Sequence, residues 1–211
     1  KNIGKCRKSL ISQTYPKNKF EIIITDDHST DQTVQVIKTF THENIRIISL
    51  ADFTGNHKIN SYKKKSIETA LKFAKGELIV TTDADCMAPP KWLNTLVSFY
   101  QKEDPVFIAL PVVFSPSRPA EKFLKRLFRI FQSLDFMTLQ GVTGAAVYQK
   151  FHGMCNGANL AYKKSAFYDV NGFAGIDEIA SGDDMLLMHK VQQVYPEKIM
   201  FLKSPDVIIE T

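Results

Sequence analysis

Two aspartates one residue apart follow a short run of strand-forming residues near the middle of the chain. The run occupies residues 78–82 of "ELIVTTDADC", and the acids are Asp83 and Asp85. Alternate residues of an extended backbone point to the same side, so we expect both carboxylates to face one way. Two such oxygen donors suit Mg²⁺ or Mn²⁺ bridging a diphosphate, with phosphate oxygens and water completing the coordination. The alternative is a polar turn that leads into the next helix.

A second pair of acids, Asp26 and Asp27, closes the earlier strand-like run "FEIIIT". Helix capping explains part of this segment, because Ser29 and Gln32 have the spacing of a capping box and acids stabilise a helix N-terminus. Capping does not require two further acids at the strand end. A carboxylate at that place can hydrogen-bond the ribose or base of a nucleotide. The residues alone leave both explanations open.

Two helix starts carry further charged residues. Asp183 and Asp184 are expected to begin a helix in "SGDDMLLMHK", where capping is the simpler explanation and general-base catalysis the alternative. Lys63 and Lys64 stand at the start of another helix, in "YKKKS". A lysine run is usually a solvated face. Lysine at a helix start opposes the helix dipole, however, and this indicates an anion nearby.

The elements that must position these residues alternate between strand and helix in the first half of the chain. Strands are predicted at 20–25, 45–50, 77–82 and 106–114, and helices at 1–10, near 31–40, at 60–74 and at 90–102. The pattern predicts an α/β fold with a mostly parallel sheet covered by helices, and such sheets bind ligands at the carboxyl ends of their strands. The second half predicts helices at 119–140, 164–170 and 182–195, with a Gly-rich segment at 141–162.

Bulk properties narrow the function classes. The 211 residues fit one domain, and a net charge of +5 with a pI near 9.0 favours anionic partners. The three cysteines cannot all pair and lack the C-x-x-C spacing, which favours a reducing compartment and no structural zinc. No P-loop, G-x-G-x-x-G or G-x-S-x-G motif occurs, so ATPase, NAD-enzyme and serine-hydrolase functions lose their main support.

Four segments together resemble the family-2 glycosyltransferases: "IIITDDHSTDQT", "KGELIVTTDADC", "CNGANLAYKKSAFYDVNGF" and "SGDD". The resemblance runs from about residue 2 to residue 210 in the family's order. It implies a GT-A fold, which is a Rossmann-like, mostly parallel sheet flanked by helices with a smaller acceptor-side portion. It also implies one catalytic domain over residues 1–211, with a nucleotide-sugar-binding half at about 1–115 and an acceptor-binding half at about 116–211.

The resemblance assigns roles to individual residues. The donor-binding residues would be Asp26, Asp27, Lys63, Lys64 and Asp83, with Asp26 and Asp27 on the uridine. Asp85 would be the direct ligand of Mn²⁺ or Mg²⁺, with Asp83 beside it. On the acceptor side the resemblance places Gly157, Asn159 and Asp183. Asp184 would be the catalytic base, and Asp183 stands where the family commonly has glutamate.

Both ends of the sequence look cut. The family's first strand should precede Lys1, and the Q-x-x-R-W segment of processive members would lie beyond Thr211. We therefore expect that these residues by themselves can lack activity even if the longer protein is an enzyme.

The expected function is inverting, metal-dependent transfer of a sugar from a nucleotide diphosphate-sugar, a UDP-sugar, to a glycan or lipid-linked acceptor. One displacement at the anomeric carbon inverts the stereocentre. The alternatives are a metal-dependent nucleotidyl or phosphoryl transferase, and an inactive or nucleotide-sugar-sensing scaffold module. Nucleic acid is not an expected partner, because the basic residues are not interleaved with aromatic residues on one sheet face.

The segment 121–139 alternates large apolar residues with lysine and arginine. It predicts either a core helix with a solvated basic edge or an interfacial helix lying on anionic lipid. The expected location is the cytoplasm, at the cytoplasmic face of a membrane. A membrane surface, or membrane segments outside the given residues, would then be a further partner.

Overall fold

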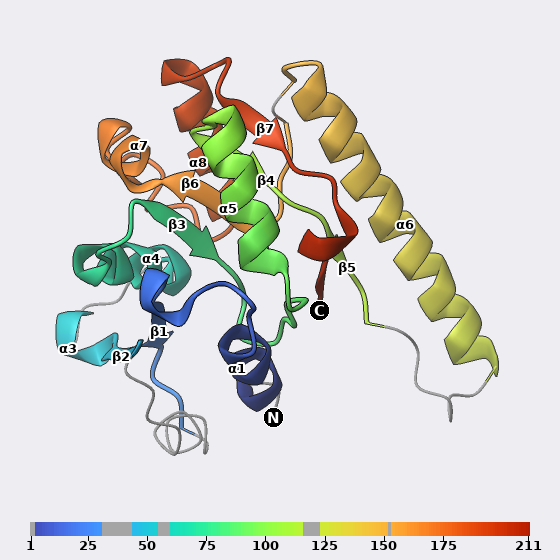
Figure 1. Ribbon diagram of the computed structural model, residues 1–211, viewed down its shortest axis with the longest axis horizontal. Helices are drawn as coiled ribbons and strands as arrows, with labels where there is room; N and C mark the ends of the chain where they lie inside the picture. The colour runs from blue at the N-terminus through green and yellow to red at the C-terminus, as the bar shows by residue number, and fades with distance from the viewer. Residues whose placement is uncertain (1–2, 31–43, 55–59, 116–122, 152) are drawn as a thin grey trace.

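The computed structural model describes residues 3–30, 44–54, 60–115, 123–151 and 153–211 as a mixed α/β fold (Figure 1). Its main sheet contains β3 (Leu78–Thr81), β6 (Leu160–Lys163), β4 (Phe107–Ala109) and β7 (Ile199–Phe201), in that order. Strands β4 and β7 are parallel, whereas β6 is antiparallel to both of its neighbours. The predicted fold class is confirmed, but neither β6 nor β7 was predicted.

Two smaller parallel pairs complete the strands of the described residues. Strand β1 (Ile22–Asp26) pairs with β2 (Ile45–Ser49), and β5 (Val112–Val113) pairs with β8 (Ile209–Glu210). The single strand predicted at 106–114 is therefore divided into β4 and β5, with Pro111 between them. Proline has no N–H to donate to a ladder, which accounts for the interruption.

The described residues also form seven helices. They are α1 (Ile3–Ile11), α3 (Ala51–Thr54), α4 (Tyr62–Phe73), α5 (Trp92–Glu103), α6 (Phe123–Tyr148), α7 (Lys164–Asp169) and α8 (Asp183–Val194), with short 3₁₀ turns η1 (Lys17–Lys19) and η2 (Pro205–Val207). Helices α7 and α8 pack on one face of the main sheet and α5 on the other. The predicted helices at 60–74, 90–102, 164–170 and 182–195 are confirmed within a few residues at their ends. The helix predicted near 31–40 lies outside the described residues.

The core has two layers because alternate side chains of a strand point to opposite faces. On one face Phe107 stacks on Tyr162, with ring centroids 6.1 Å apart, and packs with residues of α7 and α8. On the other face Ile108 packs with Trp92 and Leu96 of α5. These strands are buried on both sides, as an internal α/β sheet requires.

A cavity of about 670 Å³ separates the pair β1–β2 from the main sheet. Among the described residues, β1 forms a ladder only with β2, and β3 only with β6. Residues 22–25 of β1 and 78–81 of β3 all line the cavity. Successive side chains of a strand point to opposite faces of the sheet, so a cavity on one face alone would contact every second residue. Because consecutive residues line this cavity, it must lie along the open edges of both strands.

Helix α6 differs from the other helices in how little of it is buried. It continues to Tyr148, through Gly141 and Gly144, whereas the sequence predicted an end near residue 140. Only Thr143 and Val147 of its 26 residues are buried. Its C-terminal part packs on β7, where Gly144 lies so close to the Phe201 ring that a Cβ would come within 3.1 Å. The prediction of a core helix is therefore wrong for its N-terminal part (Figure 1).

Candidate functional site

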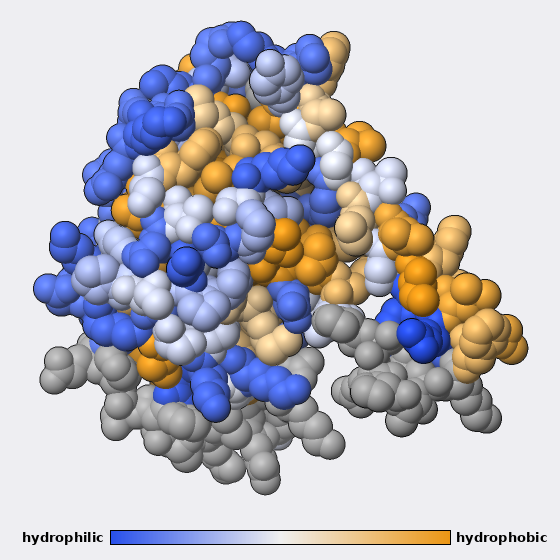
Figure 2. Space-filling view, turned by 45° about the vertical axis from the view of Figure 1, so that its right-hand side comes forward, coloured by the Kyte–Doolittle hydropathy of each residue, from blue (hydrophilic) through white to orange (hydrophobic). Residues whose placement is uncertain are grey.

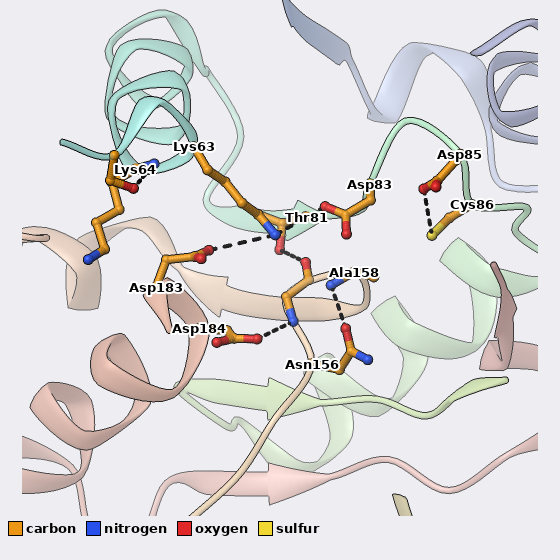
Figure 3. Close-up of polar contacts among 12 residues, drawn as sticks. Lys63, Lys64, Thr81, Asp83, Asp85, Cys86, Asn156, Ala158, Asp183 and Asp184 are labelled. Atoms are coloured by element: carbon orange, nitrogen blue, oxygen red, sulfur yellow. Dashed lines mark hydrogen bonds and ion pairs between the residues drawn. The ribbon is translucent and has the colours of Figure 1, made fainter. Parts of the chain in front are cut away.

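Four charged side chains, those of Lys63, Asp83, Asp183 and Asp184, gather in the wall of the cavity (Figure 3). Lys63 Nζ lies 3.2 Å from Asp83 Oδ1 and 3.8 Å from Asp183 Oδ2, and Asp184 lies on the other side of Gly157. These residues come from the first turn of α4, the loop after β3 and the start of α8. The structure thus brings five of the predicted site residues together from separate parts of the chain.

One ammonium group faces three carboxylates in this cluster. Burial opposes the charge on Lys63, but Asp83 and Asp183 outweigh it and raise the pKa of the amine. Burial also raises the pKa of the Asp183 carboxyl, which Lys63 partly offsets and Asp184 reinforces. Lysine therefore stays protonated at neutral pH, and the surplus of carboxylates favours a further cation.

Asp184 uses both carboxylate oxygens to fix the local backbone. Oδ2 accepts a hydrogen bond of 2.7 Å from Gly157 N, and Oδ1 accepts one of 2.8 Å from Met185 N. The N-cap of α8 is Gly182, whose φ of +74° favours glycine. Neither aspartate is therefore the N-cap residue, although Asp184 does satisfy one amide of the first turn.

Gly157 lies in the narrow space between the side chains of Lys63 and Asp184. A Cβ on it would lie 3.2 Å from Lys63 Nζ and 3.3 Å from Asp184 Oδ2. Thr81 Oγ1 donates a hydrogen bond of 3.3 Å to Gly157 O, which ties the loop before β6 to the end of β3. The role of Thr81 was not foreseen, because a threonine within a strand reads as a packing residue.

Asp83 and Asp85 do not lie on an extended backbone. Strand β3 ends at Thr81, and both acids sit in a turn where Cys86 N donates to Asp83 O at 3.1 Å. Asp83 points to Lys63, whereas Asp85 is exposed and lies apart from the cluster, beside Cys86 Sγ at 3.9 Å. The expectation that an extended strand turns both to one side is therefore wrong.

No group of three or more histidine, cysteine or acidic side chains is arranged to hold a metal ion within the described ranges. Two carboxylates on one exposed turn fit a divalent ion whose remaining ligands come from a bound diphosphate and water. The oxygen chemistry of Asp83 and Asp85 thus suits a divalent ion, but in this structure Asp83 is paired with Lys63 and Asp85 lies apart beside Cys86, so the two carboxylates do not converge on one point.

Asp26 and Asp27, the first acidic pair, also differ from each other in whether they reach the cavity. Asp27 is exposed in the loop after β1, lines the cavity shared with the charged cluster, and lies 2.9 Å from His28 Nδ1. Asp26 is the last residue of β1, opposite Ser49 of β2, and does not line the cavity.

Two residues predicted for the site have structural roles instead. Lys64 is 2% exposed, and its Nζ donates to the carbonyls of Ile176 and Ile179 at 2.5 and 2.6 Å, away from Lys63 (Figure 3). This placement does not support a donor-binding role for Lys64. Residues adjacent on a helix point in different directions, so only one of the two lysines can reach the cluster.

Asn159 is fully buried and does not line the acceptor side. Its Oδ1 accepts from Trp92 Nε1 at 3.1 Å, and its Nδ2 donates to the carbonyls of Pro111 and Val207 at 2.7 and 2.8 Å. The amide therefore joins α5 to the segments around β5 and β8. Its predicted place as a residue lining the acceptor site is corrected accordingly.

Two further polar residues of the cavity wall were missed. Thr82 Oγ1 is buried and has no hydrogen-bond partner in the described part of the chain. Arg7 of α1 is 3% exposed and also lines the cavity, next to Cys6, whose Sγ donates to Asp83 O at 3.6 Å. The amphipathic pattern of residues 1–10 predicted a helix, but it did not show that an arginine occupies the buried face.

The sequence model of "Glycosyl transferase family 2" matches residues 1–170. The chain belongs to this family. The predicted resemblance to this family is thereby confirmed, and the match includes the motifs that contain Asp27, Asp83 and Gly157 but ends before Asp184.

Relatives of this family-2 domain include glycosyltransferase AglE of Haloferax volcanii, which is 31% identical over 99 residues, or 46% of this chain and 30% of the relative. The poly(ribitol-phosphate) beta-N-acetylglucosaminyltransferase TarS of Staphylococcus aureus is 34% identical over 100 residues, or 47% of this chain and 16% of TarS. The chain thus spans a third or less of the length of these relatives.

Solved structures show the same fold. The crystal structure of S. aureus TarS residues 1–349 superposes with a TM-score of 0.70 at 19% identity, over 100% of this chain and 56% of that chain. The mannosyltransferase PcManGT from Pyrobaculum calidifontis, in complex with GDP-Man and Mn²⁺, gives 0.68 at 21% identity, over 99% and 52%. At these identities the likeness concerns the fold of the family-2 domain.

Proposed function

We propose that this family-2 domain is the catalytic part of an inverting, metal-dependent glycosyltransferase. It transfers a sugar from a UDP-sugar to a hydroxyl of a glycan or lipid-linked acceptor. The observation that carries the proposal is the cluster of Lys63, Asp83, Asp183 and Asp184 in the wall of a cavity that also reaches Asp27. Related folds support the ligand class, since TarS was solved with UDP-GlcNAc and PcManGT with GDP-Man and Mn²⁺.

The donor binds in the half formed by about residues 1–115, and the acceptor in the half formed by about 116–211. Asp27, in the loop directly after β1, accepts hydrogen bonds from the uridine, with Asp26 before it at the end of the strand. Lys63 provides the positive charge nearest the Asp83 turn, at 3.2 Å. A hydrogen bond from a charged ammonium group to a phosphate oxygen is among the stronger bonds that a site can make to a nucleotide.

Asp85 and Asp83 would hold Mn²⁺ or Mg²⁺, which neutralises the negative charge of the departing diphosphate when bound. The turn presents Asp85 to solvent, which leaves its carboxylate accessible to an ion that arrives with the nucleotide.

Asp184 acts as the base that takes the proton of the acceptor hydroxyl. Gly157 N and Met185 N hold the two oxygens of its carboxylate at 2.7 and 2.8 Å, so the group has a fixed position. Positioning counts for more than basicity here, because the hydroxyl loses its proton only as the bond to the sugar forms. Asp183, 3.8 Å from Lys63, orients that lysine on the acceptor side.

The proposed class of acceptor is based on the names of two relatives. One of them is a beta-monoglucosyldiacylglycerol synthase of Nostoc, 30% identical over 104 residues. Another, from Methanococcus voltae, is named for transfer to a dolichyl phosphate-linked sugar and is 31% identical over 112 residues. A lipid-linked acceptor favours sugar transfer at a membrane. The three unpaired cysteines favour a reducing compartment, and together these features favour the cytoplasmic face of the membrane.

Calorimetric titration of UDP, with and without Mn²⁺, tests the donor site. We expect tighter binding with the metal, and we expect Asp85→Ala to abolish the difference because it removes the direct ligand. Asp206→Ala, which changes an acid of η2 away from the cavity, is the matched control and should retain the metal effect. Equal UDP affinity with and without metal in the unaltered protein would contradict the proposal.

A further inference from the structure

The N-terminal part of α6 exposes an apolar surface that nothing in the described chain covers. Phe123, Leu124, Leu127, Phe128, Phe131 and Leu134 are each at least 54% exposed. Figure 2 shows apolar side chains gathered along this helix, at the right of the molecule. Isolated exposed hydrophobic residues are ordinary, but a contiguous set of large ones marks a binding surface. We call these six residues the α6 apolar face.

The α6 apolar face points away from the body of the domain. Successive helical residues are turned by about 100°, so side chains three, four and seven apart share a face. Phe123, Leu127 and Leu134 follow this spacing. The buried residues Thr143 and Val147, which pack on the body, fall on the opposite side of the helix. Burial against the described part of this domain therefore does not account for the apolar face.

Basic residues accompany the α6 apolar face. Lys125, Arg126 and Arg129 fall on the polar side of the same turns, and Asp135 is the only acidic residue among residues 123–148. An amphipathic helix with basic residues on its polar side is the pattern that lies in the interface of an anionic bilayer. Long basic side chains can reach the lipid phosphates while the apolar side chains enter the acyl region.

The charge and the length of the α6 apolar face favour a membrane over the other candidates that could cover this surface. A symmetric pair of copies would cover only the apolar face and bring no anionic group to Lys125 and Arg126, whereas an anionic bilayer offers a partner to both sides of the helix. A crossing helix is excluded for the described residues, since none of their helices is long and apolar enough to span a bilayer. From Phe123 to Leu134 the face extends roughly 17 Å, at about 1.5 Å per residue, which suits a helix parallel to the surface.

We propose that the N-terminal part of α6 is a membrane-docking surface that inserts the α6 apolar face into the interface of an anionic bilayer. Lys125 and Arg126 contact the phosphates of the headgroups. This surface is separate from the charged cluster, none of whose residues lies on α6. A failure of docking is therefore distinguishable from a failure of donor binding.

Spin labels report directly what covers the α6 apolar face. Leu124→Cys and, as a matched control on the polar side of the same helix, Gln132→Cys are labelled with a nitroxide and mixed with phosphatidylglycerol or phosphatidylcholine vesicles. We expect the label at position 124 to become accessible to oxygen and protected from a water-soluble nickel chelate, only with phosphatidylglycerol. The label at position 132 should stay accessible to the chelate.

Either of two other results overturns the proposal. A label at position 124 that stays accessible to the chelate shows a solvated face. One that is shielded from both oxygen and chelate shows a face covered by protein, from a second copy or from other residues of the full chain.

Charge variants test the role of the headgroups in vesicle co-sedimentation. Lys125→Gln with Arg126→Gln should weaken binding to phosphatidylglycerol by at least an order of magnitude. Lys5→Gln with Lys8→Gln removes the same charge from the exposed side of α1 and should leave binding nearly unchanged. If both pairs weaken binding equally, net charge rather than α6 is responsible and the proposal fails. UDP affinity, which we expect to be the same in all variants, verifies that each one is folded.

Discussion

At the scale of the residue, Asp183 and Asp184 are adjacent in sequence but differ in their partners. Asp184 holds the backbone of the loop before β6 through Gly157 N, whereas Asp183 faces Lys63. Burial raises the pKa of the Asp183 carboxyl, so its environment disfavours the charged form of that group. The sequence offered both acids, and their contacts are what distinguish a candidate base from a residue that orients the lysine.

Replacing Asp184 by asparagine removes the base while retaining an oxygen that can accept the Gly157 N–H. In the full-length protein we expect Asp184→Asn to lower kcat by a factor on the order of 10² to 10⁴, with unchanged UDP affinity. Asp183→Asn should cost less, because Lys63 keeps its contact with Asp83. Steady-state sugar transfer and UDP titration measure the two effects. Near-normal turnover of Asp184→Asn would place the base elsewhere.

At the scale of the element, hydrophobic periodicity predicted the long helices and the strands that deliver the acids. It missed the three-residue strand β7, and it missed β6, because "LAYK" is only four residues long and follows a Gly- and Asn-rich segment that reads as a loop. It also could not choose between Lys63 and Lys64. Both stand in the first turn of α4, and their directions depend on what α4 packs against, which one sequence does not reveal.

Helix α4 therefore yields a stability prediction. Lys64→Met removes both hydrogen bonds to the carbonyls of Ile176 and Ile179 and should lower the free energy of unfolding by about 1–3 kcal/mol. The matched control is Lys65→Met, next in the chain, which loses only a surface pair with Glu68 at 3.7 Å and should cost less than about 1 kcal/mol. Urea denaturation compares the two. Equal losses would mean that Lys64 does not anchor the segment that contains Ile176.

At the scale of the whole molecule, the predicted α/β architecture was correct, and the order of the strands was not accessible from the sequence. Strand β6 comes from the predicted acceptor half and lies between β3 and β4 of the donor half. The two halves therefore share one sheet. Long-range pairings of this kind depend on contacts between residues such as Ile79 and Tyr162, which no local pattern encodes.

The cavity between β1 and β3 has a consequence for amide hydrogen exchange. Successive N–H groups of a strand point to opposite edges, so every second amide of β3 donates toward β6 while the others face the cavity. In this chain we expect slow and fast exchange to alternate along residues 78–81, and along 22–25 of β1, when measured residue by residue with NMR. Strands β4 and β6, paired on both edges, should exchange slowly throughout. Uniformly slow exchange along β3 would contradict this expectation, because it would mean that the amides on the open edge of the strand are hydrogen-bonded as well.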